Sequence, residues 1–139
     1  MKYLLDTCVI SELVKKEPNQ NVVDWIKSVD EDFLYLSVLT IGEIQKGISK
    51  LANSSRKLKL ENWLYNDLRK RFHNRILEID EDTVIEWGKI SGNSERKGRK
   101  IPVIDALISA TSIINGCILV SRNEADFKNT GCDIFNPWT

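Results

Sequence analysis

IPVIDALISATSIINGCILVS, residues 101–121, contains the signals for a helix, its end and a following strand. Pro102 suits the first turn of a helix, and Gly116 suits a helix end. Residues 117–121 form a short apolar run that predicts a strand. A helix that leads at once into a short apolar strand is typical of a parallel sheet covered by helices. The stretch therefore predicts an α/β fold.

The same alternation of strand and helix continues on both sides of this stretch. Strands are predicted at Lys2–Leu5, Phe33–Val38, Arg75–Ile79, Cys117–Ser121 and Cys132–Phe135. Helices are predicted at Thr7–Lys16, at Asn21–Val29, from a Thr40 cap to about Ala52, over an amphipathic segment around 60–72, and after an Asp80 or Asp82 cap. Thr40 and Glu43 have the spacing of a capping box. The order predicts a central, mainly parallel sheet of about five strands.

Composition narrows the function classes. The chain has 139 residues, 42% of them hydrophobic, and 20 basic residues balance 20 acidic ones. This balance argues against bulk attraction to nucleic acid but leaves room for a local basic patch. Three cysteines without a CxxC pair predict neither a disulfide framework nor a zinc site. The single histidine, His73, disfavours Ser/His or Cys/His catalysis. Short apolar runs and no signal peptide predict a cytoplasmic protein without membrane association.

Asp105 is the one charged residue within residues 101–114. A desolvated carboxylate needs a partner. The neighbours of Asp105 at helical spacing are Ile101, Ile108 and Ser109, and none of them can neutralise it. Either Asp105 faces water at the mouth of a helix, or its partner is a cation from outside the chain.

The predicted topology places three further acids at one edge of the sheet, and Asp105 joins them if its helix starts at that edge. Asp6 ends the first strand, Glu43 lies in the first turns of the helix after the second strand, and Asp126 follows strand 117–121. Sites in parallel sheets form at the carboxyl ends of the strands. Each acid alone has an ordinary reading, as a cap or as a loop residue. Together they would repel one another unless a cation or a proton intervened.

An oxygen-rich site of this kind, without Cys or His ligands, suits Mg²⁺ or Mn²⁺. The metal ligands predicted are Asp6, Glu43, Asp105 and Asp126. Such a site commonly hydrolyses phosphodiesters. The polar neighbours Thr7, Ser121 and Asn123 are predicted to orient a carboxylate or a water in the catalytic site.

Five segments resemble the PIN-domain family, and within it the VapC-like toxins of type II toxin–antitoxin systems. The segments are YLLDTCVISEL (3–13), SVLTIGEIQKGI (37–48), IPVIDALISATS (101–112), LVSRNEADF (119–127) and FNPW (135–138). Ser121 stands where the family's Thr-Arg-Asn triplet has Thr, and Asn123 falls on its Asn. The resemblance covers nearly the whole chain, and all four acidic positions agree with the family's pattern.

This resemblance implies a single PIN domain over residues 1–139, with a three-layer α/β/α sandwich and a helical arm at 52–75. It implies a magnesium-dependent endoribonuclease toxin that acts on RNA and forms a homodimer. A cognate antitoxin would inhibit it by inserting a segment into the acidic groove, and DNA would be contacted only through that complex.

Two groups of basic residues are candidates for holding RNA phosphates. They are Lys46 and Lys50 on the Glu43 helix, and Arg96, Lys97 and Arg99 before Asp105. A plain solvated surface is the alternative reading for both groups.

Two other functions compete with the ribonuclease. One is a DNA- or RNA-binding regulatory module that acts with its antitoxin as a repressor complex without significant catalysis. The other is a phosphorylatable receiver domain, which needs an acidic pair after the first strand and a Lys after the last. The chain has only Asp6 at the first position and no matching Lys.

Overall fold

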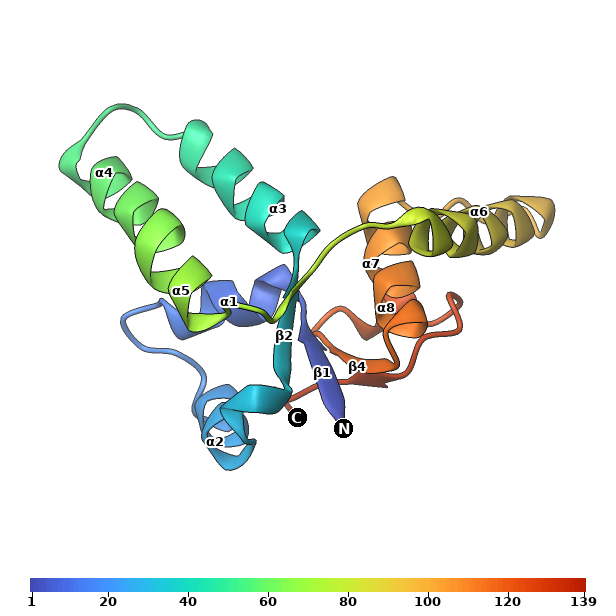
Figure 1. Ribbon diagram of the computed structural model, residues 1–139, viewed down its shortest axis with the longest axis horizontal. Helices are drawn as coiled ribbons and strands as arrows, with labels where there is room; N and C mark the ends of the chain where they lie inside the picture. The colour runs from blue at the N-terminus through green and yellow to red at the C-terminus, as the bar shows by residue number, and fades with distance from the viewer.

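Five short parallel strands form the centre of the computed structural model, which describes residues 1–139 (Figure 1). They are β1 (Lys2–Leu5), β2 (Leu34–Ser37), β3 (Ile76–Leu77), β4 (Cys117–Val120) and β5 (Ile134–Phe135). Their order in the sheet is β3-β2-β1-β4-β5. Tyr3 of β1 is in register with Leu34 on one side and with Ile118 on the other. The predicted α/β fold with a five-stranded parallel sheet is confirmed.

Side chains of alternate residues in the central strands pack into two different hydrophobic cores. Leu5 and Val120 belong to the larger core, whereas Leu4 and Leu119 belong to the smaller one. The larger core is covered by α1 (Thr7–Leu13), α2 (Gln20–Ser28), α3 (Val38–Ser49) and the arm described below. The smaller core is covered by α7 (Val103–Ile114) and α8 (Glu124–Phe127). Because strand side chains alternate between faces, the sheet is the middle of three layers.

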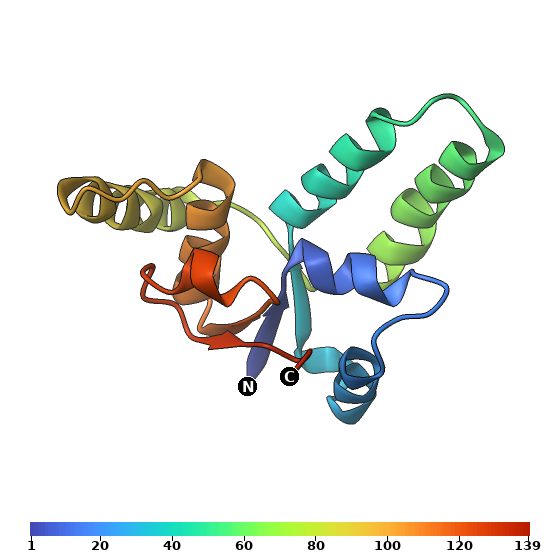
Figure 2. The same cartoon turned by 180° about the vertical axis from the view of Figure 1, so that it is seen from behind.

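The helical arm packs beside α3 as an antiparallel hairpin (Figure 2). It consists of α4 (Ser55–Asn62), a π-helical turn η2 (Trp63–Leu68) and α5 (Arg69–Arg71). Leu64, Leu68 and Phe72 are buried in the larger core. The predicted amphipathic face is therefore correct. The π turn was not predicted, because a single wide turn leaves little trace in the periodicity of apolar residues.

Helix α6 (Glu81–Arg96) packs against α7 and lies on the side of the sheet opposite the arm (Figure 1). Asp80 caps it by accepting a hydrogen bond from the Thr83 backbone N–H at 2.9 Å, which decides between the two predicted caps. A third, small core of Ile90, Ala106 and Ala110 holds the two helices together.

The predicted capping box at Thr40 is wrong. The N-cap of α3 is Ser37, whose hydroxyl accepts from the Leu39 N–H at 3.0 Å, so the helix starts at Val38. Thr40 is already inside the helix and is buried, and the side chain of Glu43 pairs with Thr7 of α1 instead. Ser37 and Thr40 are both suitable caps by residue type. Ser37 is the one used, because β2 ends there and the helix follows directly.

Several element ends also differ from prediction. The first helix stops at Leu13 instead of Lys16, and the last strand is shortened to Ile134–Phe135. The second strand was predicted to begin at Phe33, but Phe33 ends a short 3₁₀ turn, η1 (Glu31–Phe33), and the strand begins at Leu34. No helix is both long enough and apolar enough to cross a bilayer.

Candidate metal centre

Asp6 lies where β1 ends, and it is the N-cap of α1. Its backbone N–H donates to the carbonyl of Val120 at 2.9 Å, which ties the residue to β4. Its side chain accepts from the Thr7 N–H at 2.8 Å. Only 6% of Asp6 is exposed, so its carboxylate is held in one orientation.

Ser121 fixes the second oxygen of the Asp6 carboxylate. The Ser121 hydroxyl donates to Oδ2 of Asp6 at 2.8 Å and accepts from the Asn123 backbone N–H at 3.0 Å. Ser121 is fully buried. Asn123 therefore contributes to this chain of hydrogen bonds through its backbone, while its side chain is exposed and makes no hydrogen bond in the protein.

Thr7 links the first helix to the Glu43 carboxylate. Its hydroxyl donates to Oε1 of Glu43 at 2.6 Å and lies 3.3 Å from the Thr40 hydroxyl. This bond spans α1 and α3 at the sheet edge where Asp6 is held. The Thr7 hydroxyl thus holds the Glu43 carboxylate, and its predicted role in the catalytic site stays a prediction.

Asp105 lies half-buried in the first turn of α7. The pKa of Asp105 is raised from its ordinary value of 3.8 to about 6, first by burial and then by the negative charges of Asp126, Asp6 and Glu43, in that order. Each of the three other acids acts on Asp105, so the fold gathers all four at one electrostatic centre. Asp126 and Glu43 are on the exposed side of it.

No cationic side chain neutralises this group. The ion pairs of the protein join Glu12 to Lys15, and Glu31 to Arg71 and Arg75. Carboxylate and hydroxyl oxygens are the donors that Mg²⁺ and Mn²⁺ prefer. No three acidic, thiol or imidazole groups converge closely enough to ligate one ion in this conformation. Mg²⁺ usually keeps several waters and takes one or two carboxylates directly, so the donor set fits such an ion.

The structure separates the two basic groups. Lys46 lines a cavity of about 400 Å³ together with Glu43 and Ile104, beside the acids, and Lys50 is exposed one turn further along α3. Lys97 and Arg99 line a different cavity, at the far end of α6, and Arg96 is exposed beside them without lining it.

Two residues near the acids have contacts that sequence reasoning missed. The Cys8 thiol lies 3.7 Å from both the Asp6 carboxylate and the Ser121 hydroxyl, and burial raises the pKa of this thiol. The Arg122 guanidinium lies over the ring of Trp138 at 5.7 Å, which holds the chain terminus against the loop after β4. Cys8 could have been found from its place two residues after Asp6 in the first turn of α1.

Comparison with known proteins assigns the chain to a family. The PIN domain family matches residues 3–131. The chain belongs to the PIN-domain family. Among its PIN-domain relatives, the VapC ribonuclease Y4jK of Sinorhizobium fredii is 32% identical over 135 residues, which cover 97% of this chain and 96% of the relative. Toxin FitB of Neisseria gonorrhoeae is 33% identical and covers 97% of both chains.

The PIN fold also matches a solved structure over nearly its whole length. The structure of FitAB bound to an IR36 DNA fragment contains a chain with a TM-score of 0.91 and 31% identity, and the match covers 99% of this chain and 96% of that one. The three-layer arrangement and the order of the elements are therefore those of a PIN-domain toxin.

Proposed function

We propose that this protein is a metal-dependent endoribonuclease, the toxin of a toxin–antitoxin pair, which hydrolyses phosphodiester bonds in RNA. The observation that carries the proposal is a group of four carboxylates without a cationic partner at the carboxyl edge of a PIN-domain sheet. Similarity to a VapC ribonuclease over 97% of the chain supports the same activity.

Asp6 and Asp105 are the first candidates to hold Mg²⁺ or Mn²⁺, with Glu43 and Asp126 as direct or water-mediated ligands. When bound, the ion supplies positive charge for the phosphate oxygens and makes the attacking water more acidic. The chain's own residues do the positioning. Ser121 and the Thr7 N–H hold the two oxygens of Asp6, and the Thr7 hydroxyl holds Glu43.

Ligand positioning is the main task of this shell of hydroxyl groups. A carboxylate whose oxygens already accept hydrogen bonds loses little rotational freedom when a substrate arrives. The Asp6–Ser121 bond is itself buried on the inner side of the site. Glu43 and Asp126 lie on the exposed outer side, where an RNA strand has access.

Cleavage of purified RNA tests the proposal. Wild type should cut total RNA in Mg²⁺ or Mn²⁺ and should not cut it in EDTA. Asp6→Asn and Asp105→Asn should each abolish cutting, while Asp133→Asn, which alters an exposed acid outside the group, should not. If wild type cuts no RNA with either metal, or if Asp105→Asn cuts as fast as wild type, the proposal is wrong.

A cognate antitoxin, a homodimer and an indirect contact with DNA are further parts of the proposal. The FitAB structure was solved on a DNA fragment, which supports an operator-binding complex for this chain as well. A gel shift that compares the protein alone with the antitoxin complex tests this. The protein alone should not shift operator DNA, and a shift without antitoxin would favour the regulatory alternative.

A further inference from the structure

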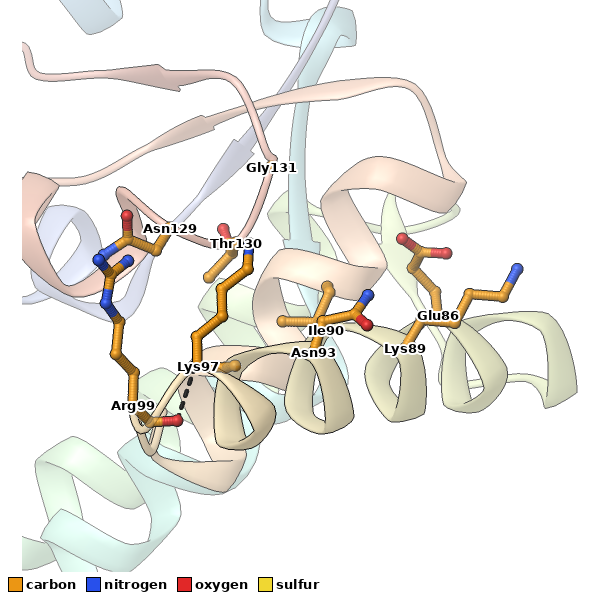
Figure 3. Close-up of a pocket in the computed structure, with 10 residues that line it drawn as sticks. Glu86, Lys89, Ile90, Asn93, Lys97, Arg99, Asn129, Thr130 and Gly131 are labelled. Atoms are coloured by element: carbon orange, nitrogen blue, oxygen red, sulfur yellow. Dashed lines mark hydrogen bonds between the residues drawn. The ribbon is translucent and has the colours of Figure 1, made fainter.

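A polar cavity of about 360 Å³ lies between the last turns of α6 and the loop at 129–131 (Figure 3). Ile90 is its only hydrophobic lining residue. One wall carries Lys89, Asn93 and Lys97, which follow one another at intervals of four and so share one face of the helix. Figure 3 shows Lys97 and Arg99 extending towards Thr130 and Asn129 on the other wall.

The cationic groups of this cavity are unpaired. None of Lys89, Lys97 and Arg99 belongs to an ion pair of the protein, although Glu86 lies at one end of the cavity. Cations near a helix C-terminus can stabilise the helix dipole. That effect accounts for Lys97 alone, because Lys89 lies two turns earlier and Arg99 lies beyond the helix.

The backbone that carries Arg99 is held in place. Gly98 has φ of +77°, which turns the chain sharply at the end of α6. The Arg99 N–H then donates to the Ser94 carbonyl at 2.9 Å, and the Ser94 hydroxyl donates to the Arg99 carbonyl at 2.8 Å. Arg99 therefore projects into the cavity from a rigid turn.

The opposite wall offers neutral donors. The Asn129 amide makes no hydrogen bond within the protein, and the backbone N–H of Gly131 also has no protein acceptor. The Thr130 hydroxyl donates to the Phe127 carbonyl at 2.7 Å and fixes this loop to α8. Cations on one wall and free N–H groups on the other are the complement of a phosphate.

Both walls are connected to the acidic centre through short stretches of chain. Arg99 precedes Asp105 by six residues, and the loop at 129–131 follows α8, the helix that carries Asp126. Both walls therefore belong to chain segments that also carry an acid of the candidate metal centre. We propose that this cavity binds a backbone phosphate of the RNA substrate, away from the scissile bond; the inference rests on the proposed ribonuclease function.

RNA binding, measured without cleavage, tests the cavity. A labelled single-stranded oligouridine is titrated by fluorescence anisotropy into the Asp105→Asn protein with Mg²⁺ at several salt concentrations. Adding Lys97→Ala and Arg99→Ala should weaken binding at least about tenfold. It should also flatten the salt slope by about 0.7 for each lost phosphate contact.

Two further variants separate the cavity from general surface charge. Lys27→Ala with Arg56→Ala removes the same charge from exposed sites that line none of the cavities described, and it should leave both the affinity and the salt slope unchanged. Asn129→Asp places a negative charge on the opposite wall and should weaken RNA binding without touching α6. A thermal melt of each variant confirms that it is folded.

The outcomes distinguish this inference from the proposed function. If the Lys97→Ala, Arg99→Ala protein binds RNA with the affinity and slope of the control pair, the phosphate site is wrong even when wild type cuts RNA. Weakened binding of duplex DNA with unchanged RNA binding also overturns it. If wild type cuts no RNA but RNA binding depends on both walls, the site stands and the ribonuclease proposal fails.

Discussion

Asp105→Asn should make the metal-free protein more stable while it destroys RNA cleavage. Asp105 is half-buried, it has no hydrogen-bond partner in the protein, and three other acids repel its charge. Asparagine has almost the same shape as the protonated acid but carries no charge at any pH. The substitution therefore removes an unfavourable charge and leaves the packing of α7 in place.

The size of the gain follows from the pKa of Asp105. A rise from 3.8 to about 6 is roughly two units, and each unit is worth about 1.4 kcal/mol. The full value of about 3 kcal/mol is an upper bound, because solvent reaches part of the side chain and screens its charge. We expect a gain of about 1–2 kcal/mol in the free energy of unfolding at neutral pH.

The pH dependence has a definite sign. The pKa of Asp105 is higher in the folded than in the unfolded state, so the folded state binds the proton more tightly. Below the ordinary value of 3.8 the acid is protonated in both states and the unfavourable charge is absent. The contribution of Asp105 to the stability of wild type falls as the pH rises from there to about 6, and the gain from Asp105→Asn grows over the same range.

Urea unfolding in EDTA, followed by circular dichroism across this pH range, measures the gain, and Asp133→Asn is the matched control. Adding Mg²⁺ should raise the stability of wild type more than that of Asp105→Asn, because only wild type keeps all four acids for the ion. An unchanged or lower stability of Asp105→Asn in EDTA at neutral pH would refute the reasoning. A stability gain from Asp105→Asn that is as large at the acid end of the range as at neutral pH would also refute it.

Three further predictions concern single contacts. Ser121→Ala should lower the free energy of unfolding by about 1–3 kcal/mol, since it leaves an oxygen of the buried Asp6 without its donor; urea unfolding at neutral pH measures this, and a loss near zero would contradict it. Trp87→Phe should cost less than an ordinary core truncation, because the Trp87 Nε1 is buried without a partner; a thermal melt that shows a large drop would contradict this. Arg71 and Arg75 hold the pKa of Glu31 below its usual range, so Glu31→Gln should destabilise the protein by less than about 1 kcal/mol at neutral pH. That difference should vanish as the pH falls through the pKa of Glu31, and a difference that persists in acid would contradict the ion pair's role.

The sequence predicted the ends of a helix correctly where only one nearby residue was suited to start or to end it. Pro102 and Gly116 bracket α7 as predicted, with the helix spanning Val103–Ile114. At α3 the signals competed, because Ser37 and Thr40 are both good caps. The strand end placed Ser37 first, so the capping box at Glu43 did not form. The apolar runs predicted β3 and β5, but each strand is only two residues long, because pairing with the neighbouring strand decides where a strand ends.

The sequence by itself was enough to predict that Asp6, Glu43 and Asp126 lie at one edge of the sheet, and that Asp105 joins them if its helix starts at that edge. Asp6 ends β1, the helices that carry Glu43 and Asp126 follow β2 and β4, and parallel strands bring their carboxyl ends to the same edge. Connectivity is enough for this result, because it needs no knowledge of how side chains pack.

Only the tertiary structure decided which side chains form hydrogen bonds with one another in the candidate site. The bond from Ser121 to Asp6 joins residues 115 positions apart, and the bond from Thr7 to Glu43 joins two different helices. The cavity between α6 and the loop at 129–131 is also assembled from distant segments. Contacts of this kind depend on distances of a few ångströms set by the packing of whole elements, and no periodicity or spacing in the chain records them.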